Sequence, residues 1–288
     1  TGARTVWERT KVAFDTSAFE VAQHWYRSKY GTRAPLWVVQ KRGHARSRNT
    51  PALLHGYGGF AVNLGPRFDA RAALWVERGG IYVQATLRGG NEFGEAWHRG
   101  GMLTNKQNVF DDFTSAAQFL VDSGFTAPER LAIRGVSNGG LLMGAAITQR
   151  PDLFRAAFVG VPDLDLVRFP TFVTHNNAPA LLEYGDARQP AEFEAIRTMS
   201  PYQHVKDGVR YPAVMVQTGI NDTRVPPWQA RRFTARLQQA STSGLPVILL
   251  HDLRSGHAGG RSMSGTVELA TREMEFLLRH VGALGRGR

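Results

Sequence analysis

Residues 131–147 read LAIRGVSNGGLLMGAAI, in which a glycine-rich turn separates two apolar runs. The first run, Leu131–Arg134, has the length and composition of a buried strand. The second run, Leu141–Ile147, is typical of a helix. Ser137 lies between the runs, with Gly135 before it and Gly139 after it. The stretch therefore predicts a strand that turns sharply into a helix, with Ser137 at the turn.

Alternating strand and helix patterns continue along the chain on both sides of this turn. Continuous apolar runs between glycines and prolines predict strands at Leu36–Gln40, Ala52–His55, Ile81–Ala85, Leu131–Arg134, Ala156–Gly160, Ala213–Thr218 and Val247–His251. Helical spacing of apolar residues predicts helices at Asn108–Ser123, Asn138–Arg150, Trp228–Ala240 and Gly265–Val281. Continuously apolar strands are typical of a parallel sheet that is covered on both faces. We expect an α/β fold with a doubly wound, mostly parallel sheet and helices on both faces.

The domain organisation follows from the same pattern. Residues 1–19 are expected to be a lead-in segment, and residues 20–288 to form one domain. Glu20–Gln40 predicts an antiparallel hairpin that turns at Tyr30-Gly31. Residues 163–209 contain no clear strand pattern, and we expect them to form a cap-like excursion over the sheet.

Composition excludes several classes of protein. The apolar runs are too short to span a bilayer, so we expect no membrane association. No leader pattern opens the chain, although it starts at Thr1 rather than Met, so a leader or a further domain can precede it. The absence of cysteine excludes disulfides, cysteine zinc sites and a thiol nucleophile. It also fits a reducing compartment, and we expect a cytoplasmic protein.

The formal net charge of +11 raises the question of a nucleic-acid partner. The arginines are scattered, however, and the densest basic stretch, residues 41–48, has no aromatic interleaving. We therefore expect a solvated basic surface and no nucleic-acid binding, and a preference for acidic substrates remains an alternative. No cluster of residues has the spacing of metal ligands, and we expect neither metal nor cofactor.

The G-x-S-x-G match at Ser137 predicts a nucleophile turn of the α/β-hydrolase fold. The alternative is an ordinary glycine-rich turn. A serine nucleophile needs a histidine base and an acid. In this fold both follow the serine along the chain, the acid first and the histidine second. Asp222 follows the penultimate predicted strand, and His257 lies in a small-residue loop after the last one. Asp252 is a rival acid at the end of the last strand, where a turn residue is the simpler interpretation, and His98 and His175 stay open as competing histidines.

An oxyanion intermediate needs two hydrogen-bond donors. The backbone N–H of Asn138, the residue after the serine, is expected to be one of them. The second is expected from the glycine-rich loop Gly56–Phe60, as either a backbone N–H or the Tyr57 hydroxyl. A plain turn with a packing tyrosine is the alternative for this loop.

A series of further motifs follows one another along the chain. They are Tyr57–Phe60, Leu87–Gly94 with Trp97-His98, Asn105–Asn108 with Asp111–Phe113, Gly135–Gly140, Arg150–Phe154 and Ser200–Tyr202. In this order they resemble the catalytic domain of the prolyl oligopeptidase family. The resemblance runs from about Glu20 to the end of the chain. It implies Ser137 as nucleophile, Asp222 as acid and His257 as base, with Tyr57 and Asn138 as oxyanion donors. It further implies that Arg224 holds a substrate carbonyl and that Phe60, Tyr184 and Val225 line the primary specificity pocket.

The chain departs from that family at three points. The family's β-propeller does not fit in this chain, so it is either lost or lies upstream of Thr1. The family's proline-stacking tryptophan falls near Ala180, and an apolar pocket position is occupied by Asp163. Asp163 could pair with a nearby arginine such as Arg168, which we favour because unpaired buried carboxylates are costly, or it could receive a basic or polar group of the substrate.

The sequence therefore predicts a serine hydrolase that cleaves short peptides or amides through an acyl-enzyme, with an altered primary pocket. The alternative is a carboxylesterase that uses the same three residues on small esters. A non-enzymatic binding module is disfavoured, because nucleophile, acid, base and both oxyanion donors are all present.

Overall fold

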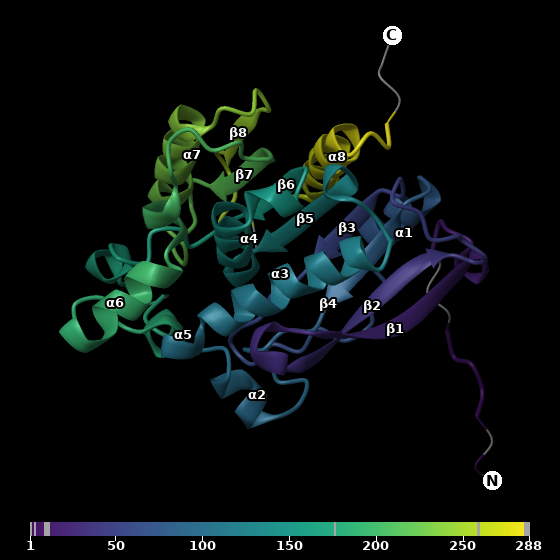
Figure 1. Ribbon diagram of the computed structural model, residues 1–288, viewed down its shortest axis with the longest axis horizontal. Helices are drawn as coiled ribbons and strands as arrows, with labels where there is room; N and C mark the ends of the chain where they lie inside the picture. The colour runs from purple at the N-terminus through teal and green to yellow at the C-terminus, as the bar shows by residue number, and fades with distance from the viewer. Residues whose placement is uncertain (1, 3, 9–11, 176, 258–259, 285–288) are drawn as a thin grey trace.

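A single sheet organises the chain in a computed structural model, which describes residues 2, 4–8, 12–175, 177–257 and 260–284. Its strands run in the order β1-β2-β4-β3-β5-β6-β7-β8 (Figure 1). Their bounds are β1 (Phe19–Arg27), β2 (Arg33–Lys41), β3 (Ala52–His55), β4 (Ile81–Ala85), β5 (Leu131–Val136), β6 (Ala156–Gly160), β7 (Ala213–Gly219) and β8 (Val247–Asp252). The pairs β1–β2 and β2–β4 are antiparallel, and the other neighbouring pairs are parallel.

Helices cover both faces of this sheet (Figure 1). Their bounds are α1 (Ala70–Glu77), α2 (Glu95–Arg99), α3 (Gln107–Asp122), α4 (Asn138–Gln149), α5 (Ala180–Tyr184), α6 (Pro190–Met199), α7 (Trp228–Ala240) and α8 (Met263–His280). Helices α3, α4 and α7 pack in the apolar cluster on one face, and α1 and α8 in the cluster on the other. In β3, Leu54 belongs to the first cluster and Leu53 to the second, because successive side chains of a strand point to opposite faces.

The predicted doubly wound, mostly parallel architecture is confirmed. All seven predicted strands are present, and their bounds differ from the prediction by a few residues at most. The expected hairpin is β1–β2, which turns at Lys29–Gly31 and pairs Leu36 with His24. Helices α1 and α2 were not expected from the sequence, because neither has a long run of helical spacing.

The borders of the expected segments can be followed in the structure. Strand β1 begins at Phe19, next to the expected start of the domain, whereas residues 1, 3 and 9–11 of the lead-in lie outside the described residues. The described part of residues 163–209 contains α5, α6 and short 3₁₀ turns, and no strand. Among the described residues, no helix has both the length and the apolar character needed to cross a membrane.

The sheet brings the functional loops to one edge. The carboxyl ends of β5, β7 and β8 point the same way, because each successive pair from β5 through β6 and β7 to β8 is parallel. Ser137 directly follows β5, Asp222 follows β7, and His257 follows β8. Together with the serine turn, this arrangement is the α/β-hydrolase fold that the sequence predicts.

Candidate active site

The turn at Ser137 explains the small residues around it. Ser137 has φ 61° and ψ −121°, a strained conformation for a residue with a side chain. Its N–H donates to the carbonyl of Gly160 over 2.8 Å, which fixes the turn against β6. A Cβ atom at Gly135 would lie 2.1 Å from the carbonyl oxygen of Gly139, and a Cβ at Gly139 would lie 2.9 Å from that of Gly56. Larger residues would therefore push the turn open.

The structure brings Ser137, His257 and Asp222 together. The Nε2 atom of His257 lies 2.9 Å from Oγ of Ser137, and its Nδ1 atom lies 2.8 Å from Oδ2 of Asp222. The other oxygen of Asp222 accepts the backbone N–H groups of Arg224 and Val225, at 3.0 and 2.8 Å. These bonds orient the carboxylate, which in turn orients the imidazole. The chain of contacts can move a proton from the serine hydroxyl to the imidazole.

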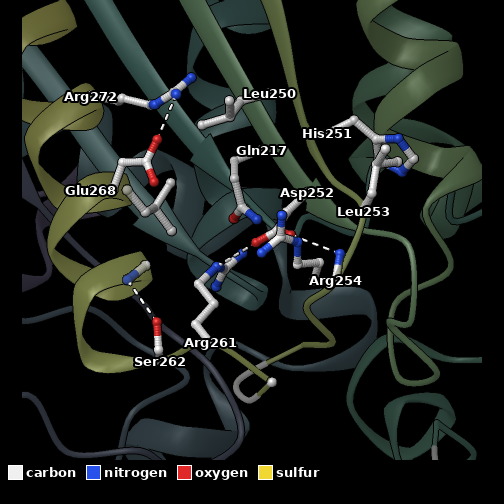
Figure 2. A pocket seen from close by; sticks show the side chains of 13 residues that line it. Gln217, Leu250, His251, Asp252, Leu253, Arg254, Arg261, Ser262, Glu268 and Arg272 are labelled. Atoms are coloured by element: carbon white, nitrogen blue, oxygen red, sulfur yellow. Dashed lines mark hydrogen bonds and ion pairs between the residues drawn. The ribbon is translucent and has the colours of Figure 1, made fainter.

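Asp252, the rival acid, holds the loop that carries His257. Its carboxylate accepts the N–H groups of Arg254 and Ser255 and pairs with Arg261 over 2.8 Å (Figure 2). Burial alone would raise the pKa of Asp252, but these hydrogen bonds outweigh it and lower the pKa to about 2. The group lines a cavity of about 560 Å³ between β8 and α8, together with Gln217. The turn role expected for Asp252 therefore agrees with its contacts; Ala258 and Gly259 of the same loop lie outside the described residues.

The two expected oxyanion donors lie beside Ser137. Asn138 is the first residue of α4, so its N–H has no partner in the helical ladder. Burial raises the pKa of Tyr57, while a hydrogen bond with the side chain of Ser137 acts in the opposite direction. The net rise keeps the phenol protonated, as a donor must be. The side-chain amide of Asn138 donates to the Tyr57 carbonyl over 2.6 Å, so the two residues that carry the expected donors are joined directly.

Comparison with known proteins assigns the chain to a family. Residues 66–284 match the family model described as the prolyl oligopeptidase family. The chain is 38% identical to the prolyl endopeptidase of Elizabethkingia meningoseptica over 283 residues, which are 98% of this chain and 40% of that protein. The chain belongs to the prolyl oligopeptidase family. The prolyl endopeptidase of Dictyostelium discoideum is also 38% identical, over 87% of this chain and 34% of that protein.

Solved structures of the prolyl oligopeptidase family have the same fold. A structure from a study of two prolyl endopeptidases superposes with a TM-score of 0.93 at 40% identity, covering 99% of this chain and 42% of that one. Oligopeptidase B from Leishmania major gives a TM-score of 0.89 at 31% identity, covering 94% of this chain and 38% of the other. The chain spans 40% and 34% of the lengths of the two curated prolyl endopeptidases named above. The β-propeller expected from the family stays a prediction.

The family's pocket residues gather next to the serine turn. The rings of Phe60 and Tyr184 meet edge to face, with centroids 5.6 Å apart. The Tyr184 hydroxyl donates to the side-chain oxygen of Asn138 over 3.1 Å. Val225 is buried beside Asp222, to which its N–H donates. Ala180 lies one helical turn before Tyr184 in α5, where residues four apart share a face.

Arg224, the other residue implied by the family, is exposed in the loop after β7. Its N–H donates to Asp222, and its charge acts to lower the pKa of Tyr57, against the larger effect of burial. The binding of a substrate carbonyl by Arg224 stays a prediction.

Asp163 is buried but does not pair with Arg168, so the pairing favoured from the sequence is wrong. Arg168 pairs instead with Asp165, over 3.2 Å, as does Arg232 over 2.8 Å. The carboxylate of Asp163 accepts a hydrogen bond of 3.0 Å from Nε2 of Gln229. Burial and the charge of Asp222 raise the pKa of Asp163 to about 7, against the Gln229 bond. Because the pKa of Asp163 is about 7, its carboxyl group can bind a proton and lose its charge. The neutral amide of Gln229 can therefore be its partner in place of a cation.

Two polar residues near the site, Lys106 and Glu183, escaped the sequence analysis as functional candidates. Lys106 and Glu183 form a buried ion pair of 2.9 Å, and Glu183 also contacts Nε2 of His98 over 2.9 Å. A lysine at the start of an amphipathic helix normally points to solvent, so nothing in the sequence signals that Lys106 is buried. Among the described residues, no group of three or more His, Asp or Glu is placed to hold a metal ion.

Proposed function

We propose that the chain is a serine hydrolase that cleaves short peptides or amides by acyl transfer. The observation that carries this proposal is the continuous contact from Asp222 through His257 to Ser137, at 2.8 and 2.9 Å. Its relatives named prolyl endopeptidases support peptides as the substrate class.

The mechanism follows from the positions of these atoms. Oγ of Ser137 attacks the substrate carbonyl while Nε2 of His257 accepts its proton. Asp222 stabilises the imidazolium through Nδ1. The N–H of Asn138 and the hydroxyl of Tyr57 donate to the oxyanion. His257 then protonates the leaving nitrogen, and water repeats the two steps on the acyl-enzyme to release the acid product and restore Ser137.

The primary pocket is proposed to accept a wider range of residues than proline. Phe60, Tyr184 and Val225 keep it largely apolar. Ala180 offers no aromatic face on which a proline ring can stack, because a methyl group replaces the family's tryptophan. Asp163 is bound to Gln229 rather than to a cation, so a direct role in binding substrate is a proposal that substitution has to test.

Labelling and turnover together test the proposal. Wild-type chain should react with a fluorophosphonate probe, and Ser137→Ala should abolish both labelling and hydrolysis. Ser264→Ala, at an exposed serine on α8, is the matched control and should behave as wild type. Labelling that persists in Ser137→Ala would overturn the assignment of the nucleophile.

The substrate class is tested by comparing prolyl, alanyl and lysyl peptide amides with short p-nitrophenyl esters on the same preparation. We expect hydrolysis of all three amides, with the prolyl amide no more than modestly preferred. Turnover of esters without any amide would establish the carboxylesterase alternative, because amide cleavage makes the greater demand on protonation of the leaving group.

A further inference from the structure

Lys106 lies without exposure to solvent at the start of α3, and its ammonium group joins two segments of the site. Its Nζ atom donates to the carbonyl of Gly58 over 2.9 Å and to Oε1 of Glu183, also over 2.9 Å. Oε2 of Glu183 lies 2.9 Å from Nε2 of His98, at the end of α2. The three side chains therefore form one network, in which Lys106 and Glu183 are buried and His98 is partly exposed.

Both partners of Lys106 are next to residues of the proposed site. Gly58 follows Tyr57, the proposed oxyanion donor, and Glu183 precedes Tyr184, which lines the pocket. Nζ of Lys106 also lies 5.4 Å from the centroid of the Tyr184 ring, within the range of a cation–π contact. One ammonium group thus fixes the separation between the oxyanion loop and the pocket wall.

Two clamps hold adjacent carbonyls of the oxyanion loop. Asn138 donates to the carbonyl of Tyr57, and Lys106 donates to the carbonyl of Gly58. Only a glycine fits at position 59 between these two side chains. A Cβ atom on Gly59 would lie 2.6 Å from Nδ2 of Asn138 and 2.8 Å from Nζ of Lys106. The loop therefore has little room to shift while both clamps are closed.

We propose that Lys106, paired with Glu183, is a positioning residue that holds the Tyr57 hydroxyl where the oxyanion develops. A buried ammonium needs acceptors in fixed directions, since it has three donors and bulk solvent does not reach it. The pair thereby determines the path of the loop that carries Tyr57. A donor that is displaced from the oxyanion loses most of its effect on the transition state. The inference rests on the proposed function, since it assigns a role within that site.

The test replaces both members of the pair, so that no buried charge is left alone. Lys106→Met with Glu183→Gln should lower kcat for a peptide anilide by about tenfold or more, because the Tyr57 hydroxyl is then poorly placed. The same two changes in a Tyr57→Phe background should alter kcat by less than about twofold, since the donor they position is already absent. A double-mutant cycle gives this coupling directly.

A matched control comes from another buried ion pair. Arg134 and Glu273 join β5 to α8 on the opposite face of the sheet, and both are buried. Arg134→Met with Glu273→Gln should lower the melting temperature by about as much as the Lys106 and Glu183 changes do. Its effect on kcat should be the same in the wild-type and Tyr57→Phe backgrounds, so its coupling to Tyr57 in the double-mutant cycle should be zero. If the Lys106 and Glu183 changes prevent folding, as judged by circular dichroism, Lys106→Gln with Glu183→Gln serves instead, because two neutral amides can still hydrogen-bond and no buried charge is left alone; the same non-additivity with Tyr57→Phe is expected.

The outcomes separate the two proposals. A wild-type chain that neither labels at Ser137 nor hydrolyses any substrate would overturn the proposed function. If the wild-type chain hydrolyses substrate, and the losses in kcat from the Lys106–Glu183 changes and from Tyr57→Phe multiply in the combined variant, only the positioning role is overturned. An unchanged kcat in the Lys106–Glu183 variant would overturn it as well.

Discussion

The side-chain amide of Asn138 donates a 2.6 Å hydrogen bond to the carbonyl oxygen of Tyr57, so the residue after the proposed nucleophile holds the loop of the proposed second oxyanion donor. The oxygen of the same amide accepts the hydroxyl of Tyr184 over 3.1 Å. One short side chain therefore links the serine turn, the oxyanion loop and the pocket wall.

Asn138→Ala tests this link, because it removes the side chain and keeps the backbone N–H. We expect kcat for a peptide anilide to fall by about tenfold, as the Tyr57 hydroxyl loses one of its two supports. Asn49→Ala, at an exposed turn, is the control and should leave kcat unchanged. Equal activity of Asn138→Ala and wild type would show that the loop keeps its position without this amide.

Tyr57→Phe removes the hydroxyl and keeps the ring. The expected loss in kcat is about a hundredfold, the usual effect of one oxyanion donor. Steady-state kinetics with a peptide anilide measure it, and the KM should change little because the hydroxyl acts on the transition state. If the rate stays as in wild type, a backbone N–H of the glycine-rich loop is the second donor instead.

Asp163→Asn should change how stability depends on pH. The pKa of Asp163 is raised to about 7 in the folded chain, mainly by burial, from 3.8 for an ordinary aspartate. Between these values the folded state binds a proton that the unfolded state has lost, so stability from this group is lost as pH rises. Asparagine cannot titrate, and the variant should therefore lose less stability over this range, by up to about 1.4 kcal/mol per pH unit.

Urea unfolding between about pH 4 and about pH 8 measures this slope. Glu129→Gln, at an exposed carboxylate, is the control and should keep the wild-type slope. Parallel curves for Asp163→Asn and wild type would contradict the shifted titration. The same variant, assayed with prolyl, alanyl and lysyl amides, should keep the wild-type substrate profile if Asp163 only binds Gln229.

Gly135→Ala should destabilise the serine turn. The added Cβ would lie 2.1 Å from the carbonyl oxygen of Gly139, which is backbone and cannot rotate away. Overpacking of this kind costs about 1–3 kcal/mol, and labelling of Ser137 should slow in parallel. Gly65→Ala is the matched control, since a Cβ there meets nothing within 4 Å. Wild-type stability in Gly135→Ala would mean that the turn can relax.

Ala180→Trp should raise the preference for proline before the cut. An indole at this position, one helical turn before Tyr184, would present a flat face to a proline ring. We expect kcat/KM for prolyl over alanyl amides to increase by about tenfold, corresponding to about 1.4 kcal/mol of stacking. Leu182→Trp, at an exposed position of the same helix, is the control. No change in the ratio would place the specificity outside α5.

Several elements could be predicted from the sequence because their causes are local. The apolar runs and glycines around Ser137 specify a strand, a turn and a helix whatever the rest of the chain does. The strands Ala52–His55, Ile81–Ala85 and Ala156–Gly160 have the bounds that their apolar residues predict. Helix α1 could not be predicted in this way, because its eight residues are too few to show a period.

The same distinction between local and long-range causes applies to the candidate site. Chain order and loop composition suffice to select Ser137, Asp222 and His257, since the fold fixes which loops meet. The pairing of Asp163 with Arg168 failed, although the two are near in sequence, because Asp165 lies nearer to Arg168 and Gln229 of α7 reaches Asp163 from 66 residues away.

The sequence by itself determined the strand–turn–helix at Ser137, the α/β architecture and the choice of residues proposed for acyl transfer, since these depend on local pattern and chain order. Only the tertiary structure decided that Lys106 is buried against Gly58 and Glu183, and that Asn138 holds Tyr57. Those contacts join residues 48 to 81 positions apart. A buried polar group takes whichever partner packing brings within reach, and its own sequence neighbours carry no record of that partner.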